Sequence, residues 1–418
     1  MANNKNTKVP NVPNLRFPEF EGGWMESTIG KQFELYSGNT PSRLNKDYFK
    51  GEINWISSGE LKDHYIYSSK EKISQEASLN LKLLPAGTFV IAIYGLEAEG
   101  VRGTGSIIKE QSTISQACMA FSSIGEVENE FLYSWYKKHG NIIGLKYAQR
   151  TKQQNLSYDI LERFKIAYPS KQEQEKLYNF ISLLDERIAT QNKIIEDLKK
   201  LKSAIIEKLF CSPKDKQPEV RLHGFSENWQ IIRLSEICHR IRCKNTEEQC
   251  KRVLTIAAQY GLVSQEEFFN KNVASENLSG YYLLQNGDFA YNKSYSGDYV
   301  WGTVKRLDNY EQGVLSPLYI CFRPDSAKVD SDFLVYYFES KKWHKAVADI
   351  AGEGARNHGL LNISVIDYFN TIHCIPSMDE QKQIAQIMSA LLSKIAREQR
   401  MLNCYTIQRQ YLLRQMFI

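Results

Sequence analysis

One group of residues in this sequence has the side-chain types of a metal-dependent hydrolase. Asp325 is followed by Glu339 and Lys341, and two carboxylates beside a lysine hold magnesium in many nucleases. That chemistry needs the second carboxylate and the lysine on one exposed strand, whereas residues 333–343 have the pattern of a helix. Lys137 occupies the position of Glu339 in an internal repeat of the chain. The pattern is therefore not expected to form a nuclease site.

Other signatures of catalysis or metal binding are missing from the sequence. There is no Gly-x-x-x-x-Gly-Lys-Ser/Thr loop for a nucleoside triphosphate. There is also no Asn-Pro-Pro or Asp-Pro-Pro tripeptide followed by an aromatic residue, with which amino-methyltransferases hold a target base. The glycines of residues 100–105 lack the spacing of a dinucleotide-binding loop. Cys238, Cys243 and Cys250 lie near His239 without a usual zinc spacing. We expect no active site, no metal site and reduced structural cysteines.

Two pairs of polar loops carry the residue types that recognise DNA. Arg, Lys, Asn and Gln side chains bind base edges, and Lys, Ser and Thr hold phosphates. In each half of the chain, one such loop follows the main predicted strand and a second precedes an Asn-Leu/Ile-Ser triplet. The candidate DNA-binding residues are Tyr94, Arg102, Lys146, Arg150, Thr151, Lys152 and Gln153 in the first half, and Asn292, Lys293, Tyr295, Arg356, Asn357 and His358 in the second. For any single residue, a solvent-exposed loop position remains the alternative.

The bulk composition permits DNA binding without requiring it. A length of 418 residues suits two or more domains, and 42% hydrophobic with 24% charged residues is typical of globular proteins. A net charge of +5 is only mildly basic, so a local basic face matters more than the total. No apolar run approaches the roughly 20 residues of a membrane span, and the first eight residues are polar, unlike a signal peptide. We expect a cytoplasmic protein.

An internal repeat spans almost the whole chain. Residues 13–24 match residues 218–229 at a Pro, an Arg, a Phe and a Trp, each shifted by 205 residues. Further matches follow in order, at shifts between 200 and 207, and include the two Asn-Leu/Ile-Ser triplets at 155–157 and 362–364. The matches fall mainly on turn glycines and apolar positions, which set a fold, while the stretches between them differ. The pattern predicts one scaffold used twice, with two different surfaces.

The first part of each repeat is predicted to be mostly β. A β-branched and aromatic run at 89–94 is preceded by the turn residues 85–87, and residues 287–291 repeat it. Further strands are predicted at 106–108, 117–121 and 317–322, and helices at 130–140 and 332–348. These elements predict an α+β domain with a mostly β core.

Each repeat ends in a long helix with heptad spacing. Glu173 and Glu380 provide acidic first turns, shortly after a proline. Apolar residues then recur at alternating steps of four and three, which is typical of a coiled coil. These residues are Leu177, Ile181, Leu184, Ile188, Ile195 and Leu198 in the first helix, and Ile384, Met388, Leu391, Ile395 and Leu402 in the second.

Two polar breaks in each heptad pattern fall at matching positions. Gln191 and Lys202 interrupt the first helix, and Glu398 and Arg409 interrupt the second, 207 residues later in both cases. A helix of about 40 residues is about 60 Å long, and another element has to cover its apolar face. We therefore expect the two helices to pair as an antiparallel coiled coil with a pseudo-twofold axis. The alternative is that each helix packs on its own domain.

From about Pro13 to Ile418 the chain resembles the specificity subunit of type I restriction-modification enzymes. The resemblance rests on the Phe20/Trp24 and Phe225/Trp229 pairs, the Trp-Ile-Ser-Ser-Gly-Glu segment at 55–60, the Asn-Leu/Ile-Ser triplets, the Pro-x-x-x-Glu-Gln helix starts and the duplicated helices. It implies two target-recognition domains that each bind one half of a split DNA site. The paired helices would set the distance between the halves and dock two methyltransferase subunits, which motor-nuclease subunits join. No cofactor is expected on this chain, and S-adenosylmethionine, ATP and Mg²⁺ are expected on the partner subunits.

The resemblance and the repeat together predict six segments and an α+β fold class. These segments are a tail at 1–12, a target-recognition domain at 13–169, a helix at 170–211, a linker at 212–217, a second target-recognition domain at 218–376 and a second helix at 377–418. Two other functions stay open on the residues alone. One is a DNA-modifying enzyme, a methyltransferase or nuclease, with its own active site. The other is a coiled-coil scaffold that binds only proteins.

Overall fold

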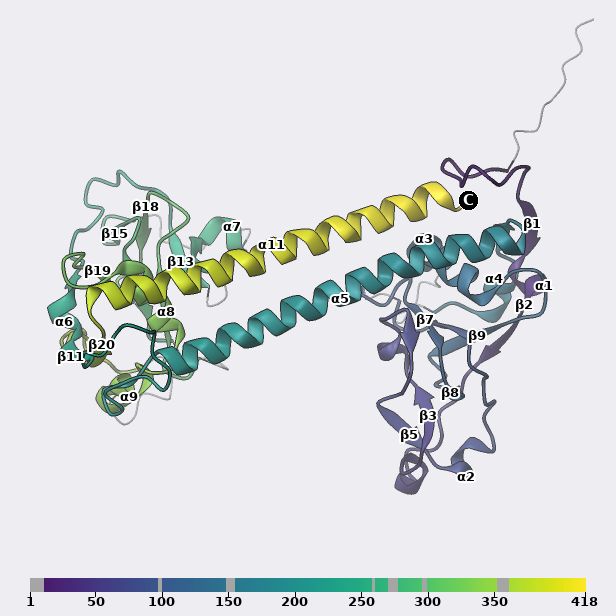
Figure 1. Ribbon diagram of the computed structural model, residues 1–418, viewed down its shortest axis with the longest axis horizontal. Coiled ribbons are helices and arrows are strands. Elements are labelled where there is room, and N and C mark those ends of the chain that lie inside the picture. The colour runs from purple at the N-terminus through teal and green to yellow at the C-terminus, as the bar shows by residue number, and fades with distance from the viewer. Residues whose placement is uncertain are drawn as a thin grey trace, which may run out of the picture. The chain divides into compact units, whose positions relative to one another are not determined.

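The computed structural model describes residues 11–96, 100–147, 155–257, 260–269, 277–294, 299–351 and 361–418. It divides into two compact units, residues 1–193 with 399–418, and residues 194–398. Each unit contains one globular domain, the first part of the long helix that follows this domain, and the last part of the other long helix. Figure 1 labels many of the helices and strands.

The globular domain of unit 1 is built on a five-stranded sheet in the order β2-β9-β6-β7-β4. Its neighbouring strands are antiparallel, except that β4 runs parallel to β7. Two smaller sheets, β5-β3-β8 and β1-β10, complete the domain. The strands are β1 (Met25–Thr28), β2 (Phe33–Ser37), β3 (Ile53–Ile56), β4 (Tyr65–Ile66), β5 (Glu71–Ile73), β6 (Phe89–Ala92), β7 (Gly105–Ile108), β8 (Ser112–Ile114), β9 (Cys118–Ser123) and β10 (Lys165–Tyr168).

The globular domain of unit 2 repeats four of the five strands of this main sheet. Its main sheet has the order β12-β19-β16-β17, and β11 pairs with β20 as β1 pairs with β10. Phe289 stands opposite Phe322 as Phe89 stands opposite Phe121. The internal repeat predicted from the sequence is thereby confirmed. The strands are β11 (Gln230–Arg233), β12 (Cys238–Arg240), β13 (Leu254–Ala257), β14 (Gly261–Ser264), β15 (Tyr282–Gln285), β16 (Phe289–Asn292), β17 (Thr303–Arg306), β18 (Gln312–Leu315), β19 (Ile320–Pro324) and β20 (Ile372–Ile375).

The main helix of each domain differs from its prediction. In unit 1, α3 (Asn129–Tyr147) continues past Gly140, where the sequence predicted its end. In unit 2, the predicted helix at 332–348 is divided into α8 (Ser331–Glu339) and α9 (His344–Ile350). Short helices occupy the turns: α1 (Ile29–Gln32), α2 (Gln75–Ser78), α4 (Tyr158–Glu162), α6 (Leu234–Ile237), α7 (Gln265–Phe269), α10 (Val365–Phe369), and the 3-10 helices η1 (Lys46–Phe49) and η2 (Ser58–Glu60).

The two long helices, α5 (Lys171–Leu209) and α11 (Met378–Met416), have 39 residues each. The predicted heptad residues are buried or half-buried along both helices. Within unit 1 the two helices run antiparallel, because Phe417 lies near Trp24, a partner of Glu173 at the start of α5, while Arg409 pairs with Asp185 further along α5. Among the described residues, no helix has both the length and the apolar character of a membrane span.

The end of each long helix lies in the core of the domain that it does not follow. Phe417 packs against Trp24 and Phe131 in unit 1, with ring centroids 6.5 and 5.3 Å away. Phe210 packs against Phe333 in unit 2, 5.3 Å away. The alternative in which each helix packs only on its own domain is therefore wrong. Burial of an aromatic side chain stabilises a core by a few kcal/mol, so these contacts hold each helix end in place.

Candidate nucleic-acid interface

The start of each long helix is attached to its domain by the same ion pair. The Arg16 guanidinium donates to both carboxylate oxygens of Glu173 at 2.8 and 2.7 Å. Arg221 makes the same two bonds to Glu380, at 3.0 and 2.8 Å. Both carboxylates are almost fully buried, and these hydrogen bonds raise the pKa of each arginine. The Glu of the Pro-x-x-x-Glu-Gln motif thus has a structural role.

The glutamine of the same motif joins the helix start to the segment that precedes α3 or α8. The Gln174 side chain donates to the Pro169 carbonyl oxygen at 3.0 Å and accepts from the Glu128 N–H at 3.0 Å. Gln381 donates to the Pro376 carbonyl oxygen at 2.9 Å and accepts from the Asp330 N–H at 2.8 Å. Since a bidentate ion pair and a buried amide fix each helix start, the domain is held in one orientation on the first turns of its helix.

The described flanks of the two predicted DNA-binding loops of unit 1 meet at the end of strand β6. Leu156, just after one loop, donates its N–H to the Ile93 carbonyl oxygen at 3.0 Å, and Ile93 directly precedes Tyr94 in the other. The Tyr94 side chain is exposed. Arg102 donates to Asn141 on α3 at 3.2 Å and to the Leu96 carbonyl oxygen at 2.9 Å, so its guanidinium holds the loop after β6 against α3.

The described flanks of the two loops of unit 2 meet in the same way. Leu361 donates its N–H to the Lys293 carbonyl oxygen at 2.9 Å, which joins the second predicted loop to the end of β16. The Asn292 side chain accepts from the Ser294 N–H at 3.0 Å, and Lys293 is half-buried. The candidates Arg150, Thr151, Lys152, Gln153, Tyr295, Arg356, Asn357 and His358 lie outside the described residues. In both units, therefore, the flanks of the two predicted loops converge on one end of the main sheet.

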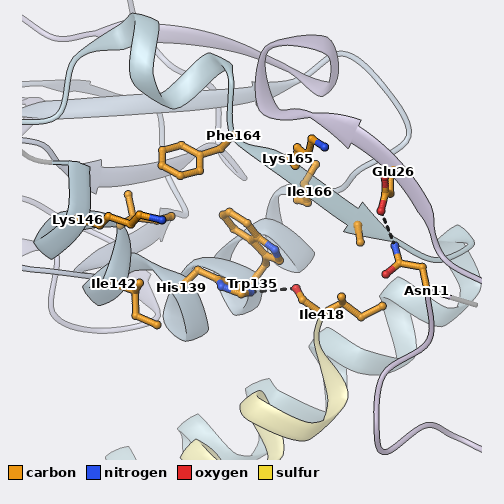
Figure 2. A pocket seen from close by; sticks show the side chains of 12 residues that line it. Asn11, Glu26, Trp135, His139, Ile142, Lys146, Phe164, Lys165, Ile166 and Ile418 are labelled. Atoms are coloured by element: carbon orange, nitrogen blue, oxygen red, sulfur yellow. Dashed lines mark hydrogen bonds between the residues drawn. The ribbon is translucent and has the colours of Figure 1, made fainter. Parts of the chain in front are cut away.

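The last described candidate, Lys146, lines a cleft of about 350 Å³ in unit 1 (Figure 2). Trp135, Phe164 and Ile418 give this cleft an apolar wall. The His139 ring lies 3.0 Å from the Ile418 backbone oxygen, and burial lowers the pKa of His139 to about 4, so its imidazole is neutral at pH 7. The cleft brings together no nucleophile and base, and its histidine serves to hold the end of the chain.

The nuclease-like residues do not form a metal site. Glu339 Oε2 is 2.6 Å from Lys202 Nζ, while Asp325 faces Lys328 and His239. Throughout the described ranges, no three His, Cys, Asp or Glu side chains gather closely enough to hold a metal ion. All eight cysteines are free thiols. Glu339 and Asp325 therefore form ion pairs within the protein.

Sequence reasoning missed the partners of the polar breaks in the heptads. Lys202 forms an ion pair with Glu339 on α8, and Arg409 forms one with Asp185 on α5. The sequence held one signal for the first pair, because the repeat places Lys137 in unit 1 where unit 2 has Glu339. Helix α5 ends in unit 2, and its polar break Lys202 is cationic. Its partner Glu339 is acidic, whereas unit 1 has a lysine at the equivalent position.

A family comparison assigns both halves of the chain. The sequence profile of the "Type I restriction modification DNA specificity domain" matches residues 21–200 and again residues 226–403. The chain belongs to this family. The two matches include both globular domains and most of both long helices, so the chain is a DNA specificity protein with two copies of the family's domain.

Two curated relatives come from Methanocaldococcus jannaschii. The type I restriction enzyme MjaIX specificity subunit is 27% identical over 228 residues, which cover 51% of this chain and 51% of that protein. That match thus spans about half of each protein. The MjaVIII specificity subunit is 23% identical over 402 residues, covering 90% of this chain and 87% of the relative.

Solved structures show the same fold. The S subunit of a type I restriction-modification system from M. genitalium aligns with a TM-score of 0.58 at 17% identity, over 97% of this chain and 99% of that one. A chain from a structure of complex assembly and conformational transition of the type I R-M system aligns with a TM-score of 0.54 at 14% identity, over 96% and 98%. The predicted fold class, two α+β domains with two long helices, is confirmed.

Proposed function

We propose that this chain selects the DNA target of a type I restriction-modification system by binding a bipartite site, with one half-site for each globular domain. The observation that carries the proposal is that the flanks of two polar loops converge at the end of β6 and again at the end of β16. The scaffold is the same in both units, whereas the loop sequences differ. Two different loop surfaces on one scaffold suit the recognition of two different base sequences.

The long helices would set the spacing between the two half-sites. Helix α5 is continuous from Lys171 to Leu209 and joins the first domain to the second unit. A helix of this length rises about 58 Å, and a DNA duplex rises about 34–36 Å per turn. An insertion of four residues near Asp197 adds about 6 Å. It should lengthen the spacer of the methylated site by one or two base pairs without changing the half-site sequences.

We further propose that the chain has no catalytic activity of its own. It would act with two methyltransferase subunits and with motor-nuclease subunits, and these partners would carry S-adenosylmethionine, ATP and Mg²⁺. The relatives named specificity subunits support this division of labour. The eight free cysteines fit a reducing cytoplasm.

The proposal is tested with the full chain, alone and co-expressed with the methyltransferase subunit of its system. Gel-shift binding to genomic fragments should require a bipartite site, and methyl transfer from S-adenosylmethionine should occur only with the methyltransferase subunit present. Methyl transfer by the chain alone would show an active site in this protein. A complex that assembles but binds all DNA fragments equally would leave only a scaffold function.

A further inference from the structure

A basic cleft of about 720 Å³ lies in unit 2, outside the loops assigned to base recognition. Its walls come from the last turns of α5, the beginning of β17 and the turn between α8 and α9. The cations that line this basic cleft are Lys202, Lys305, Lys341 and Lys342. The acidic residues along it are Glu207 and Glu339, and Glu339 is already paired with Lys202 at 2.6 Å. The lining therefore carries an excess of positive charge.

Three of the four lysines of the basic cleft differ from Lys202 in their charge partners. Within the described part of the chain, Lys305, Lys341 and Lys342 form no ion pair with a carboxylate. Lys305 is half-buried, and burial lowers its pKa. Burying an ammonium group without a partner is costly, and a bound anion would remove that cost. By contrast, Lys345 on α9 has Asp349 at 2.5 Å.

In the described part of unit 1, other residues occupy the space equivalent to the basic cleft. In the strand registers, Ser106 on β7 takes the place of Lys305 on β17. Strand β4 covers the outer edge of β7, and Ser106 donates to the Asp63 carbonyl oxygen at 2.5 Å. Among the described residues of unit 2, no strand pairs with that edge of β17. The fold does not require the open cleft, which is therefore a property of the second domain.

His64 completes the filling in unit 1. Its ring stacks between Tyr65 and Tyr133, at 3.9 Å from each ring centroid, and its Nε2 lies 2.8 Å from Glu130. At the position of Glu339, unit 1 carries the half-buried Lys137. The first domain thus has aromatic rings and a histidine paired with Glu130 where the second domain has the lysines of the cleft.

The position of the basic cleft relates it to the predicted DNA interface. Tyr299, Gly302 and Thr303 line the cleft, and Thr303 pairs across the sheet with Asn292 at the end of β16. The cleft therefore begins at the sheet end where the two recognition loops converge. Cations beside a base-reading surface are where the phosphates of the same duplex pass.

From this arrangement we propose that the basic cleft binds the sugar-phosphate backbone of the DNA duplex next to the half-site read by the second domain. The proposal rests on the proposed function and adds a sequence-independent contact to it. Lysine ammonium groups act as point charges toward phosphate. Their distribution over α5, β17 and the α8–α9 turn suits a row of phosphates better than one small anion.

The test uses the complex of the full chain with its methyltransferase subunits and a DNA duplex that contains the methylated site. Variants Lys305→Gln, Lys341→Gln and Lys342→Gln are combined, and affinity is measured over a range of salt concentrations. Each lost phosphate contact should reduce the steepness of the salt dependence by about 0.9, so the triple variant should change the slope by about 2–3 units. Affinity at low salt should fall roughly tenfold or more, with unchanged discrimination between half-site sequences.

Lys341→Gln and Lys345→Gln form a matched pair of single variants. Both remove one exposed lysine, but only Lys341 lines the basic cleft, so only its loss should change the salt slope. Lys305→Gln should not lower the melting temperature, since the charge it removes is disfavoured by burial. If the triple variant fails to fold, the exposed Lys341 alone still tests the proposal through its comparison with Lys345.

Several results would overturn the cleft assignment while leaving the proposed function intact. One is an unchanged slope in the triple variant, and another is an equal change with Lys345→Gln. If the triple variant binds its methyltransferase subunits more weakly, but the complex that does assemble binds DNA with normal affinity, the cleft is a protein interface. Stabilisation by inorganic phosphate at matched ionic strength, with unchanged DNA affinity, would make it a small-anion site. Failure of the wild-type complex to bind the duplex would instead contradict the proposed function, and the cleft proposal with it.

Discussion

The two units hold the incoming end of a long helix by the same apolar contact but by different ion pairs. Phe417 in unit 1 and Phe210 in unit 2 fill equivalent places in their cores. Arg409, eight residues before Phe417, pairs with Asp185 on the neighbouring long helix. Lys202, eight residues before Phe210, pairs with Glu339 on the domain helix α8. The contact that supplies stability is shared, whereas the charged contact is particular to each unit.

This difference indicates how each helix end is matched to its unit. Unit 1 carries Lys137 where unit 2 carries Glu339, and burial together with nearby Arg409 lowers the pKa of Lys137 to about 8. A lysine from the end of α5 would meet another cation there. The apolar contact favours any helix end of this type, and the ion pairs discriminate between the two, as charges commonly do in helix pairing.

The largest effect should follow from removing the shared apolar contact. Phe417→Ala and Phe210→Ala should each cost about 3–5 kcal/mol of unfolding free energy, the usual loss for a buried aromatic ring, because both rings are nearly inaccessible to solvent. Urea denaturation, followed by hydrogen exchange in each unit, measures the loss where it occurs. Phe268→Ala is the control, since this ring is exposed and should change stability by less than about 0.5 kcal/mol. A large loss in only one unit would show that the two contacts are not equivalent.

Breaking the ion pair at the helix starts should have the next largest effect. Glu173→Ala and Glu380→Ala each leave a mostly buried arginine unpaired, which costs about 3 kcal/mol. Glu173 also accepts from the Trp24 indole at 3.3 Å, whereas the buried Trp229 indole has no partner in the described residues. The loss should therefore be about 1 kcal/mol greater in unit 1. Equal losses in thermal unfolding would show that the indole contact contributes nothing.

Acid should weaken unit 2 through His373. Burial lowers the pKa of His373 to about 4, while an unfolded histidine has a pKa near 6.5. Between these values the unfolded chain binds the proton and the folded chain does not, so stability is full above pH 6.5 and falls as the pH drops toward 4. The loss reaches about 3 kcal/mol. His373→Gln should flatten this dependence in unit 2 and leave the contribution of His139 in unit 1. An unaltered pH profile of unfolding would contradict this assignment.

The smallest effect is expected from reversing the ion pair of unit 2. Lys202→Glu or Glu339→Lys alone should destabilise the docked helix end by about 1 kcal/mol, because like charges then face each other at a partly solvated site. The double reversal should recover most of that loss in a double-mutant cycle. Additive losses in the double variant would show that the two side chains do not interact.

Periodic sequence patterns predicted the elements that are long enough to show a period and that occur in both repeats. The heptads gave both long helices to within a residue or two of α5 and α11, and the run at 89–94 gave strand β6. The three-residue strand β5 and the two-residue β4 are too short to carry a period, since pairing with neighbouring strands creates them. The helix expected to stop at Gly140 continues, and this glycine allows the loop at Gly103 to pack closely against α3. At the break between α8 and α9, the buried Trp343 donates its indole N–H to the Phe338 carbonyl oxygen at 3.0 Å, a side-chain contact that the periodicity does not show.

The sequence predicted which loops carry the candidate interface residues, but it did not predict the contacts that individual side chains make. The sequence predicted Tyr94 and Lys293 on polar loops at matching places of the repeat, and both lie just after a strand of the main sheet, β6 or β16. Their role in DNA binding stays a prediction. Arg102 is engaged by Asn141 and Leu96, a set of partners that depends on where α3 passes. The basic cleft joins lysines more than 100 residues apart in sequence. Among the described residues of unit 2, no strand pairs with the outer edge of β17, and no local pattern reveals this.

The central claim is that each globular domain reads its own half of a split target, and methylome sequencing tests it most directly. A host expressing the complex is compared with one whose chain carries, in place of residues 13–165, the corresponding domain of a relative. The account predicts a bipartite methylated motif in both hosts, with one half changed, and with the other half and the spacer kept. A motif in which both halves change while the chain remains folded, or a single unsplit motif in the wild type, would contradict it.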